Sequence, residues 1–230
     1  MYGYSFNFNH GVIASSGGGS NPLWDNLLAY YTADNTPNDS VGAANFTLNN
    51  GATYGTGIIN QGFDFDGVND YANHTTDVGV TDDFTISTWV YRDTTATSSV
   101  FETANFGSAG SFSLTLQGGS IVVYAHNGSS YISQFAGVGI TLSTWTHIAF
   151  TFNNTTKLVD IYIDGVLSNG STPTFTSVTS SDFANGMIIG RRLGFQYFNG
   201  LTDELGVWNR ILTSGEVTEL YNSGAGKQYT

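Results

Sequence analysis

Hydrophobic and polar residues alternate along most of this chain, and turn residues interrupt the alternation at short intervals. Within residues 62–91, Phe63 and Phe65 belong to one alternating run and residues 84–91 form a second. Such runs are typical of β-strands with one face on a core. Between residues 107 and 128, Gly- and Asn-containing breaks fall about ten residues apart, a spacing that favours a sandwich or barrel of antiparallel strands.

Residues 62–91 organise the predicted fold. Five apolar side chains of this stretch are expected to form the framework of the core, namely Phe63, Phe65, Phe84, Ile86 and Trp89. Its aspartates at 66 and 70 read as turn residues, because Asp side chains accept hydrogen bonds from nearby backbone N–H groups in turns. The pattern Phe-(Asp/Asn)-Gly-x-x-Asp at residues 65–70 recurs at residues 198–203, which include Asn199 and Asp203. We interpret the recurrence as a shared type of turn and not as a duplication.

The segment 145–152 is apolar on both of its faces. Trp145 and His147 lie on one face with Ala149 and Thr151, while Ile148, Phe150 and Phe152 lie on the other. A strand of this kind is expected in the middle of a sheet, with both faces covered. His147 is therefore predicted to be a core residue, and the four scattered histidines lack the spacing of a zinc site.

Only one convincing helix is predicted, near the C-terminus. Thr213 and Glu216 match a capping box, and Leu212 and Val217 stand at the hydrophobic staple positions. Gly224 is placed to end the helix.

Two regions are predicted along the chain. Residues 1–22 read as an N-terminal arm and Gly/Ser linker, and residues 23–230 as one sandwich domain. The arm alternates aromatic and polar positions before SSGGGS, so it either docks on a larger assembly or forms a tail or an extra edge strand.

Composition narrows the possible partners. The 230 residues carry a formal net charge of -12, so binding to nucleic acid or insertion into an anionic membrane is not expected. Calcium and neutral glycans suit such a surface better. The chain has no cysteine, so the fold rests on its core without disulfides. The first residues do not resemble a secretion signal, which leaves a removed signal or release within a virus particle as alternatives.

Seven segments in order resemble the bacterial and viral branch of the laminin-G-like, concanavalin A-like lectin domains. They are LLAYYTADNTPNDSVG, GFDFDGVNDYA, FTISTWVY, TWTHIAFTFN, LVDIYIDG, MIIG and FNGLTDELGVWNRILTSGEVTELY. The resemblance implies an all-β, antiparallel two-sheet jelly-roll sandwich, with one curved sheet and one short C-terminal helix. It also implies that the first and last strands lie side by side.

The same resemblance implies a metal site. Neighbouring first and last strands would bring Asp34 near Asp203, where related domains often hold one structural calcium. The alternative is that these aspartates only accept hydrogen bonds from backbone N–H groups.

A carbohydrate site needs aromatic faces beside polar or guanidinium groups. Candidates on strands and loops expected at the concave face or rim are Tyr91, Arg92, Tyr124, His126, Tyr131, Arg191, Arg192 and Tyr197. For each of them, packing within the domain is the alternative role.

Catalysis is not predicted. A glycosidase on this fold would place two or three carboxylates on alternate residues of one strand, and the chain has no Glu-x-Asp-x-Glu pattern. Asp203 and Glu204 are adjacent, so their side chains are expected on opposite faces of a sheet. Asp64 and Asp66 have the spacing that such a glycosidase needs, but they are predicted to form the solvent-facing side of a strand whose Phe63 and Phe65 point inward.

These observations favour a non-catalytic, lectin-like surface module that binds host or environmental glycans. Display on a virus particle, as a head or tail fibre or decoration protein, is the expected location, with an extracellular or cell-surface location as the alternative. We expect residues 1–20 to join a larger assembly, and a homo-oligomer is possible. Two other functions stay open: a purely structural capsid or tail subunit, and a carbohydrate-binding module of a secreted polysaccharide-degrading system.

Overall fold

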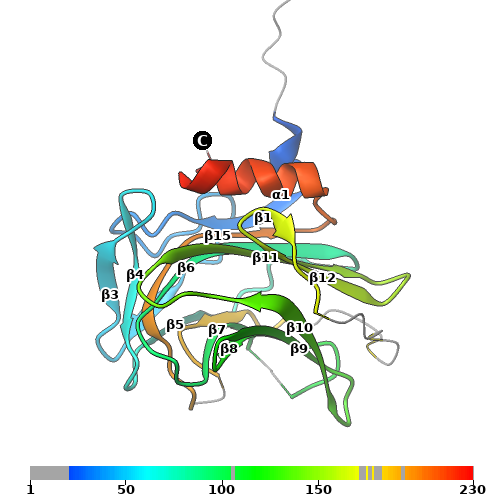
Figure 1. Ribbon diagram of the computed structural model, residues 1–230, viewed down its shortest axis with the longest axis horizontal. Helices are drawn as coiled ribbons and strands as arrows, with labels where there is room; N and C mark the ends of the chain where they lie inside the picture. The colour runs from blue at the N-terminus through cyan, green and yellow to red at the C-terminus, as the bar shows by residue number, and fades with distance from the viewer. Residues whose placement is uncertain are drawn as a thin grey trace, which may run out of the picture.

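Two antiparallel sheets face each other in this protein, as a computed structural model shows (Figure 1). The structure describes residues 21–104, 107–170, 175, 178, 183–192 and 195–229, so the predicted arm at residues 1–20 lies outside the described residues. The predicted jelly-roll sandwich with one short C-terminal helix is confirmed.

The eight-stranded sheet contains the first and last strands, which pair with each other as predicted. Its order is β13 (Val166–Leu167), β12 (Leu158–Ile163), β11 (Trp145–Asn153), β6 (Phe84–Arg92), β15 (Asn199–Trp208), β4 (Gln61–Asp66) and β3 (Thr53–Thr56), with β1 (Leu27–Tyr31) paired to β15. β11 lies between β6 and β12, in agreement with its two apolar faces.

The seven-stranded sheet lies below the first in Figure 1. Its order is β10 (Tyr131–Gly139), β9 (Ser120–His126), β8 (Phe112–Gln117), β7 (Ser98–Thr103), β14 (Met187–Ile189), β5 (Tyr71–His74) and β2 (Thr47–Asn49). Residues 168–170 after β13 bond to β10, where Gly170 N–H donates to the Phe135 carbonyl at 2.8 Å. The two sheets are thereby joined along one edge.

The main core fills the space between the sheets and is rich in phenylalanine. Phe63, Phe65, Phe84 and Ile86 belong to it, as predicted. Trp89 does not, because it alternates onto the other face of β6 and stacks on Tyr221 at 5.7 Å. Trp89 is buried as predicted, but it packs against Tyr221 on the helix-covered side of the sheet and not between the two sheets.

A second apolar cluster lies between the eight-stranded sheet and helix α1 (Ser214–Tyr221), which covers the outer face of that sheet (Figure 1). The capping box of Thr213 and Glu216 is present, and Leu212 and Val217 are buried. The helix ends at Tyr221, with Asn222 as a left-handed cap at φ 48°, instead of at Gly224. The short 3-10 turns are η1 (Pro22–Trp24) and η2 (Asn222–Gly224).

The two ends of the described chain lie beside each other near α1 (Figure 1). Asn21 Nδ2 donates to Glu219 Oε1 at 2.9 Å, and the rings of Trp24 and Tyr229 are 5.4 Å apart. Both ends of the described chain therefore lie on the helix-covered side of the domain.

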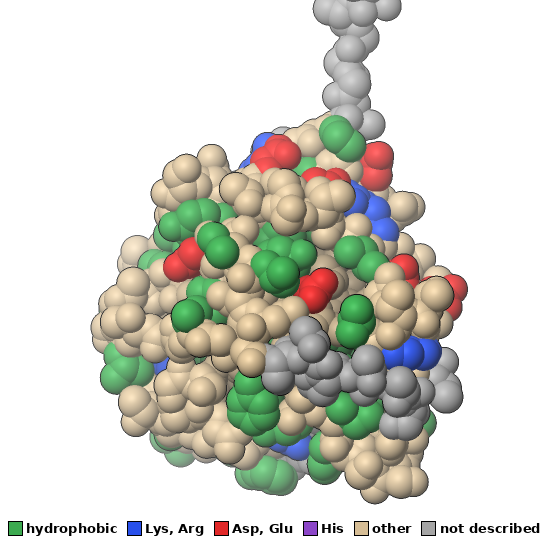
Figure 2. All heavy atoms as spheres, turned by 45° about the vertical axis from the view of Figure 1, so that its right-hand side comes forward, with side chains coloured by type: hydrophobic (Ala, Val, Ile, Leu, Met, Phe, Trp, Pro, Cys, Tyr) green, Lys and Arg blue, Asp and Glu red, His purple; other side chains and the backbone are tan. Residues whose placement is uncertain are grey.

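The surface is mostly uncharged and polar. Only 10% of residues are charged, and Figure 2 shows their side chains scattered among uncharged polar atoms on one face. No helix among the described residues is long and apolar enough to cross a membrane.

Candidate functional site

The outer face of the seven-stranded sheet brings together several of the predicted sugar-binding residues. Alternation along β9 buries Ile121, Val123 and Ala125 in the main core, so Tyr124 points to the outer face. Tyr124 lies opposite Ser133 of β10 and Ser113 of β8.

Two arginines lie on this face directly after β14. The Arg192 guanidinium is 5.0 Å from the centre of the Tyr124 ring and 5.1 Å from that of Tyr131. The Arg191 guanidinium is 3.5 Å from the centre of the Tyr71 ring. A guanidinium over an aromatic face is attracted by the electron-rich ring, which holds both side chains against the sheet.

The backbone after β14 is shaped for this placement. Gly190 has a left-handed φ of 85°, and a Cβ there would lie 2.7 Å from the Phe65 ring. Arg192 and Phe195 then exchange two backbone hydrogen bonds of 3.0 and 2.8 Å. Gln196 accepts a hydrogen bond from Ser99 N–H of β7 at 3.1 Å. Residues 190–192 and 195–196 are thus held against the sheet by backbone hydrogen bonds.

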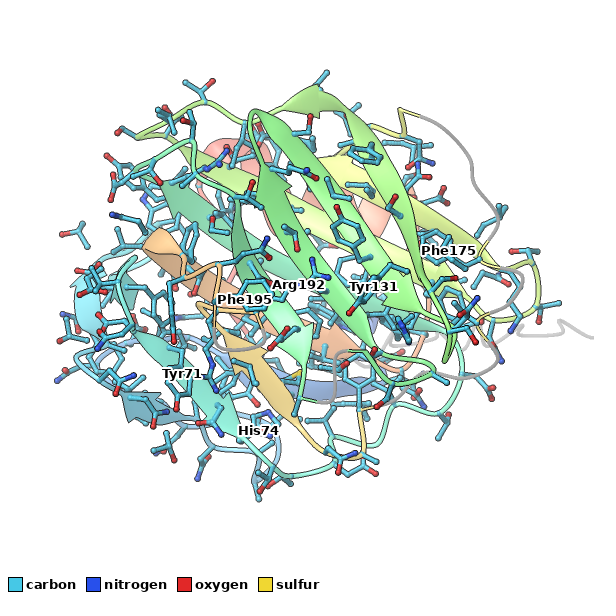
Figure 3. The ribbon with its side chains drawn as sticks, turned by 90° about the horizontal axis from the view of Figure 1, so that it is seen from below. Tyr71, His74, Tyr131, Phe175, Arg192 and Phe195 are labelled. Atoms are coloured by element: carbon cyan, nitrogen blue, oxygen red, sulfur yellow. The ribbon has the colours of Figure 1, made fainter. Side chains whose placement is uncertain are left out.

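Three aromatic side chains on this face are exposed. Their relative exposures are 46% for Tyr131, 41% for Phe135 and 54% for Phe195. Figure 3, seen from below, shows Phe195, Arg192 and Tyr131 in a row across the sheet. We call the set Tyr124, Tyr131, Phe135, Arg192 and Phe195 the arginine face. Aromatic C–H and π surfaces next to a fixed guanidinium suit a sugar ring and its hydroxyl groups.

The remaining candidates near this face have supporting positions. His126 is buried, its Nδ1 accepts a hydrogen bond from Gly128 N–H at 3.1 Å, and its ring packs edge-on against Tyr131. It orders the exposed ring instead of facing a ligand. Tyr197 is half-buried in the same segment as Phe195.

Arg92 does not lie on a binding surface, which contradicts its prediction as a sugar-binding residue. It is 1% exposed and points inward from β6. Its guanidinium donates to the carbonyls of Gly118 and Ala96. Since Gly118 belongs to the turn between β8 and β9, Arg92 ties the two sheets together. Burial lowers the pKa of its guanidinium.

Tyr91 lies apart from the arginine face, on the outer side of the other sheet. It borders a pocket of about 370 Å³ that we call the acidic pocket. The pocket is lined by Gly55, Thr56, Asp64, Tyr91, Trp145 and Leu201. The predicted candidates therefore divide between two surfaces on opposite sheets.

Asp34 and Asp203 approach each other where β1 pairs with β15, as predicted, and Glu204 joins them. Asp34 Oδ1 accepts a hydrogen bond from Gln61 N–H at 3.1 Å. Asp203 Oδ2 accepts from the N–H groups of Ile58 at 2.9 Å and Ile59 at 3.1 Å. These three acidic residues form what we call the carboxylate cluster.

Asp203 and Glu204 face the same, helix-covered side, so the prediction of opposite faces is wrong. The strand bulges between Asp203 and Gly206, and Glu204 has a left-handed φ of 50°. The bulge directs Glu204 Oε2 to the Tyr30 hydroxyl, which donates to it at 2.5 Å. Gln228 Nε2 donates to both Glu204 and Asp34.

Burial raises the pKa of both inner acids of the cluster. The pKa of Asp203 rises to about 7, against the effect of its backbone donors, and the nearby Asp34 adds to the rise. The pKa of Glu204 rises to about 8 through burial, followed by repulsion from Asp203 and Asp34. Desolvation disfavours the charged form of a carboxylate, which explains both directions.

The hydrogen bonds that Asp34 and Asp203 accept argue against the predicted calcium site. The carboxylate oxygens of Asp34 and Asp203 each accept hydrogen bonds from protein donors, which supply partners without a cation. Across the described ranges, no group of three or more acidic, histidine or cysteine side chains is arranged to hold a metal ion. The observed contacts fit the alternative of backbone hydrogen bonding better, and calcium here stays a prediction.

Sequence reasoning missed Trp145, Phe135, Phe195 and Tyr71 as surface residues. For Trp145 a signal exists, because the alternation that directs Ile148 and Phe150 to the core directs Trp145 outward. Its pairing with Tyr91 depends on the register of two strands far apart in sequence. Phe195 acquires its place from the backbone turn after Gly190, which has no such signal.

Comparisons with known proteins agree with this architecture. A sequence model described as the concanavalin A-like lectin/glucanases superfamily matches residues 66–218. None of the curated proteins compared with the chain matches it.

Among solved structures, domain 4 of AbnA, a GH43 extracellular arabinanase from Geobacillus stearothermophilus in complex with arabinotriose, is 25% identical, with a TM-score of 0.70. The match covers 84% of this chain and 97% of that domain. The binding domain of Paraclostridial Mosquitocidal Protein 1 is 21% identical with a TM-score of 0.68, covering 88% of this chain and 53% of that one. The third is a structure of botulinum neurotoxin type C, a toxin whose cell entry depends on interaction with two ganglioside molecules. It is 14% identical to this chain, with a TM-score of 0.69. That match covers 87% of this chain and 52% of the toxin chain.

Proposed function

Because the chain belongs to the concanavalin A-like lectin/glucanases superfamily, we propose that it is a non-catalytic, lectin-like module that binds glycans on its arginine face. The observation that carries the proposal is the Arg192 guanidinium, which lies over Tyr124 and Tyr131 and whose backbone is bonded to that of exposed Phe195. Phe135 adds a further exposed ring on β10. Sugars bind proteins through stacking of C–H faces on aromatic rings and through hydrogen bonds to fixed polar groups.

The proposal that the module is non-catalytic rests on the carboxylate cluster. Asp203 and Glu204 are an adjacent acidic pair with raised pKa values, as general acids often have. They are 1% and 4% exposed, and Gln228 and Tyr30 cover them. A glycosidic bond cannot reach carboxyl groups buried in this way.

The test is a glycan array screened with the folded chain, followed by titration of each hit. Tyr131→Ala removes one exposed ring of the arginine face, so it should weaken binding about tenfold or more. Leu167→Ala is the matched control, since Leu167 is an equally exposed apolar residue on β13. Binding by the control and loss in the Tyr131 variant support the proposal. An array without hits from folded protein would favour the purely structural role instead.

A second candidate is a carbohydrate-binding module of a secreted polysaccharide-degrading system. It is favoured by the similarity to domain 4 of an extracellular arabinanase, which the chain matches over 97% of that domain. Arabino-oligosaccharides are therefore the first soluble ligands to titrate. Binding that Tyr131→Ala abolishes would support this candidate, and binding restricted to host-surface glycans would contradict it.

Display on an outer surface belongs to the same proposal, with a virus particle as the first location and a cell surface or the extracellular space as the alternatives. The support is a mostly uncharged polar surface that carries a net charge of -12. Assembly through residues 1–20 is tested by deleting them and measuring incorporation into particles. Unchanged incorporation of the shortened chain would contradict the anchoring role.

A further inference from the structure

The acidic pocket is built by strand register on the outer face of the eight-stranded sheet. Asp64 of β4 lies opposite Leu201 of β15, Leu201 opposite Tyr91 of β6, and Tyr91 opposite Trp145 of β11. These four side chains form one row across four strands, so hydrogen-bonded backbone fixes their spacing. The pocket needs no movement to form.

Two aromatic rings form one wall of this pocket. The rings of Tyr91 and Trp145 have centroids 5.6 Å apart and are tilted by 56°, and both residues are half-buried. Within the described parts of the chain, neither the Tyr91 hydroxyl nor the Trp145 indole N–H has a hydrogen-bond partner. The ring faces attract cations and C–H groups, and the two polar hydrogens are available to a ligand.

Asp64 gives the pocket its charge. It is half-buried and forms no ion pair with any lysine or arginine that the structure describes. Burial raises the pKa of its carboxyl group, and the neighbouring Asp93, Asp70 and Asp66 raise it further. The lining residues include no basic side chain. A cation beside Asp64 would relieve this repulsion, whereas an anionic sugar would add to it.

Gly55 keeps the pocket open. A Cβ at this position would lie 2.6 Å from Leu201 Cδ2 and 3.2 Å from Asp64 Oδ2. The space beside the carboxylate therefore exists because residue 55 has no side chain.

We propose that the acidic pocket binds a primary ammonium group on a compact saturated body, with the ammonium at Asp64 and the C–H surface against Tyr91 and Trp145. An amino sugar and a lysyl side chain share this chemistry. The volume of about 370 Å³ is near the lower end for small-ligand sites and suits one such unit. The site goes beyond the proposed glycan function because it lies on the other sheet and prefers the opposite charge.

The test uses two matched pairs of ligands in calorimetric titrations of the whole chain at about pH 6, where both amines are protonated. One pair is a short glucosamine oligomer and its N-acetylated counterpart. The other is Nα-acetyl-lysine amide and its Nε-acetylated form. The proposal expects at least one free amine to bind and its acetylated partner to lose about tenfold or more in affinity. Equal binding within both pairs, or no binding by either amine, would overturn it.

Variants locate the site. Asp64→Asn should weaken amine binding about tenfold or more, whereas the exposed Asp25→Asn removes the same charge elsewhere and should change it little. Gly55→Ala narrows the pocket without changing any charge and should also weaken binding, which serves if Asp64→Asn does not fold. Tyr131→Ala on the arginine face should leave amine binding unchanged. Equal affinities of the Asp64 and Asp25 variants would contradict the assignment.

Discussion

The arginine face and the acidic pocket use the same kind of aromatic surface with opposite charge. Tyr124 and Tyr131 on the seven-stranded sheet lie under Arg192, whereas Tyr91 and Trp145 on the eight-stranded sheet lie beside Asp64. Aromatic rings supply contact area in both places, and the neighbouring charged group determines which ligand is favoured. The difference in charge between the two surfaces means that exposed aromatic residues alone do not predict which class of ligand a face of this sandwich favours.

The two surfaces also differ in how the backbone builds them. The acidic pocket follows from the register of four strands, and the arginine face depends on residues 191–192 and 195–196, which lie between β14 and β15. A site built from strands is insensitive to loop changes, while a site built with a connecting segment changes with it. Both still depend on the core between the sheets.

Removing the shared core should have the largest effect. Phe84 packs between the sheets, with ring centroids 4.8 Å from Phe112 and 5.8 Å from Phe150. Phe84→Ala should lower the free energy of unfolding by about 3–5 kcal/mol, because it leaves a cavity and loses buried area. Chemical denaturation measures this loss. A loss as small as that of Leu167→Ala would contradict a common core under both surfaces.

Raising the pH should destabilise the helix-covered side of the eight-stranded sheet. Asp203 and Glu204 have raised pKa values of about 7 and about 8, so the folded state retains protons that the unfolded state releases near pH 4. Their contribution is complete below the unfolded pKa and is lost as the pH rises through the folded values. Between about pH 6.5 and 8.5 the free energy of unfolding should fall by about 3 kcal/mol.

A variant identifies the group responsible. Glu204→Gln keeps an oxygen acceptor near Tyr30 and Gln228 without the charge, so it should flatten the decline in urea melts. His74 and His147 have pKa values lowered by burial to about 4 and about 3, so they destabilise the fold only on acidification below about pH 6.5. An unchanged slope in the variant would contradict the role of the carboxylate cluster.

Deleting one aromatic ring from each surface tests whether the two surfaces bind different ligands. Tyr131→Ala should cost about tenfold in glycan affinity and leave amine binding intact, and Trp145→Ala should do the reverse. The physical reason is that each ring contacts a ligand on one sheet only. Parallel titrations of both variants with both ligands measure the result. Loss of both activities in either variant, with unfolding temperatures preserved, would contradict the assignment of one ligand to each sheet.

Salt should weaken amine binding in the acidic pocket more than glycan binding on the arginine face, and the effect should be smaller than that of the ring deletions. Raising the ionic strength from about 0.01 M to about 0.1 M shortens the screening length from about 30 Å to about 10 Å. Amine binding beside Asp64, Asp66 and Asp93 should weaken about threefold, since part of the attraction acts over distance. Binding of a neutral glycan should change little. A salt-independent amine affinity would contradict the contribution of these carboxylates.

The faces of single strands were predictable from the sequence, because alternation has a fixed period of two. The inward positions Phe84 and Ile86 were correctly assigned. The same alternation places Arg92 on the inward face and Trp89 on the helix-covered face of β6, so the position of Arg92 contradicts its prediction as a sugar-binding residue.

Relations between distant strands were less predictable. The family resemblance correctly placed the first strand beside the last, and with it Asp34 near Asp203. The pairing of Tyr91 with Trp145 needs a register that no local pattern encodes. The bulge at Glu204 requires a left-handed φ at a residue type that rarely adopts it, so alternation gave the wrong side. Some residues of the candidate sites could therefore be predicted from the sequence. Which of them lie together on one surface could not.

The neighbouring chain ends have a consequence for attachment. Because Asn21 contacts Glu219 and Trp24 contacts Tyr229, the two ends of the described chain meet on the helix-covered side of the domain. Such a domain can be inserted into a surface loop of another protein without separating the loop ends. In such an insertion the arginine face, which belongs to the opposite sheet, would point away from the host protein.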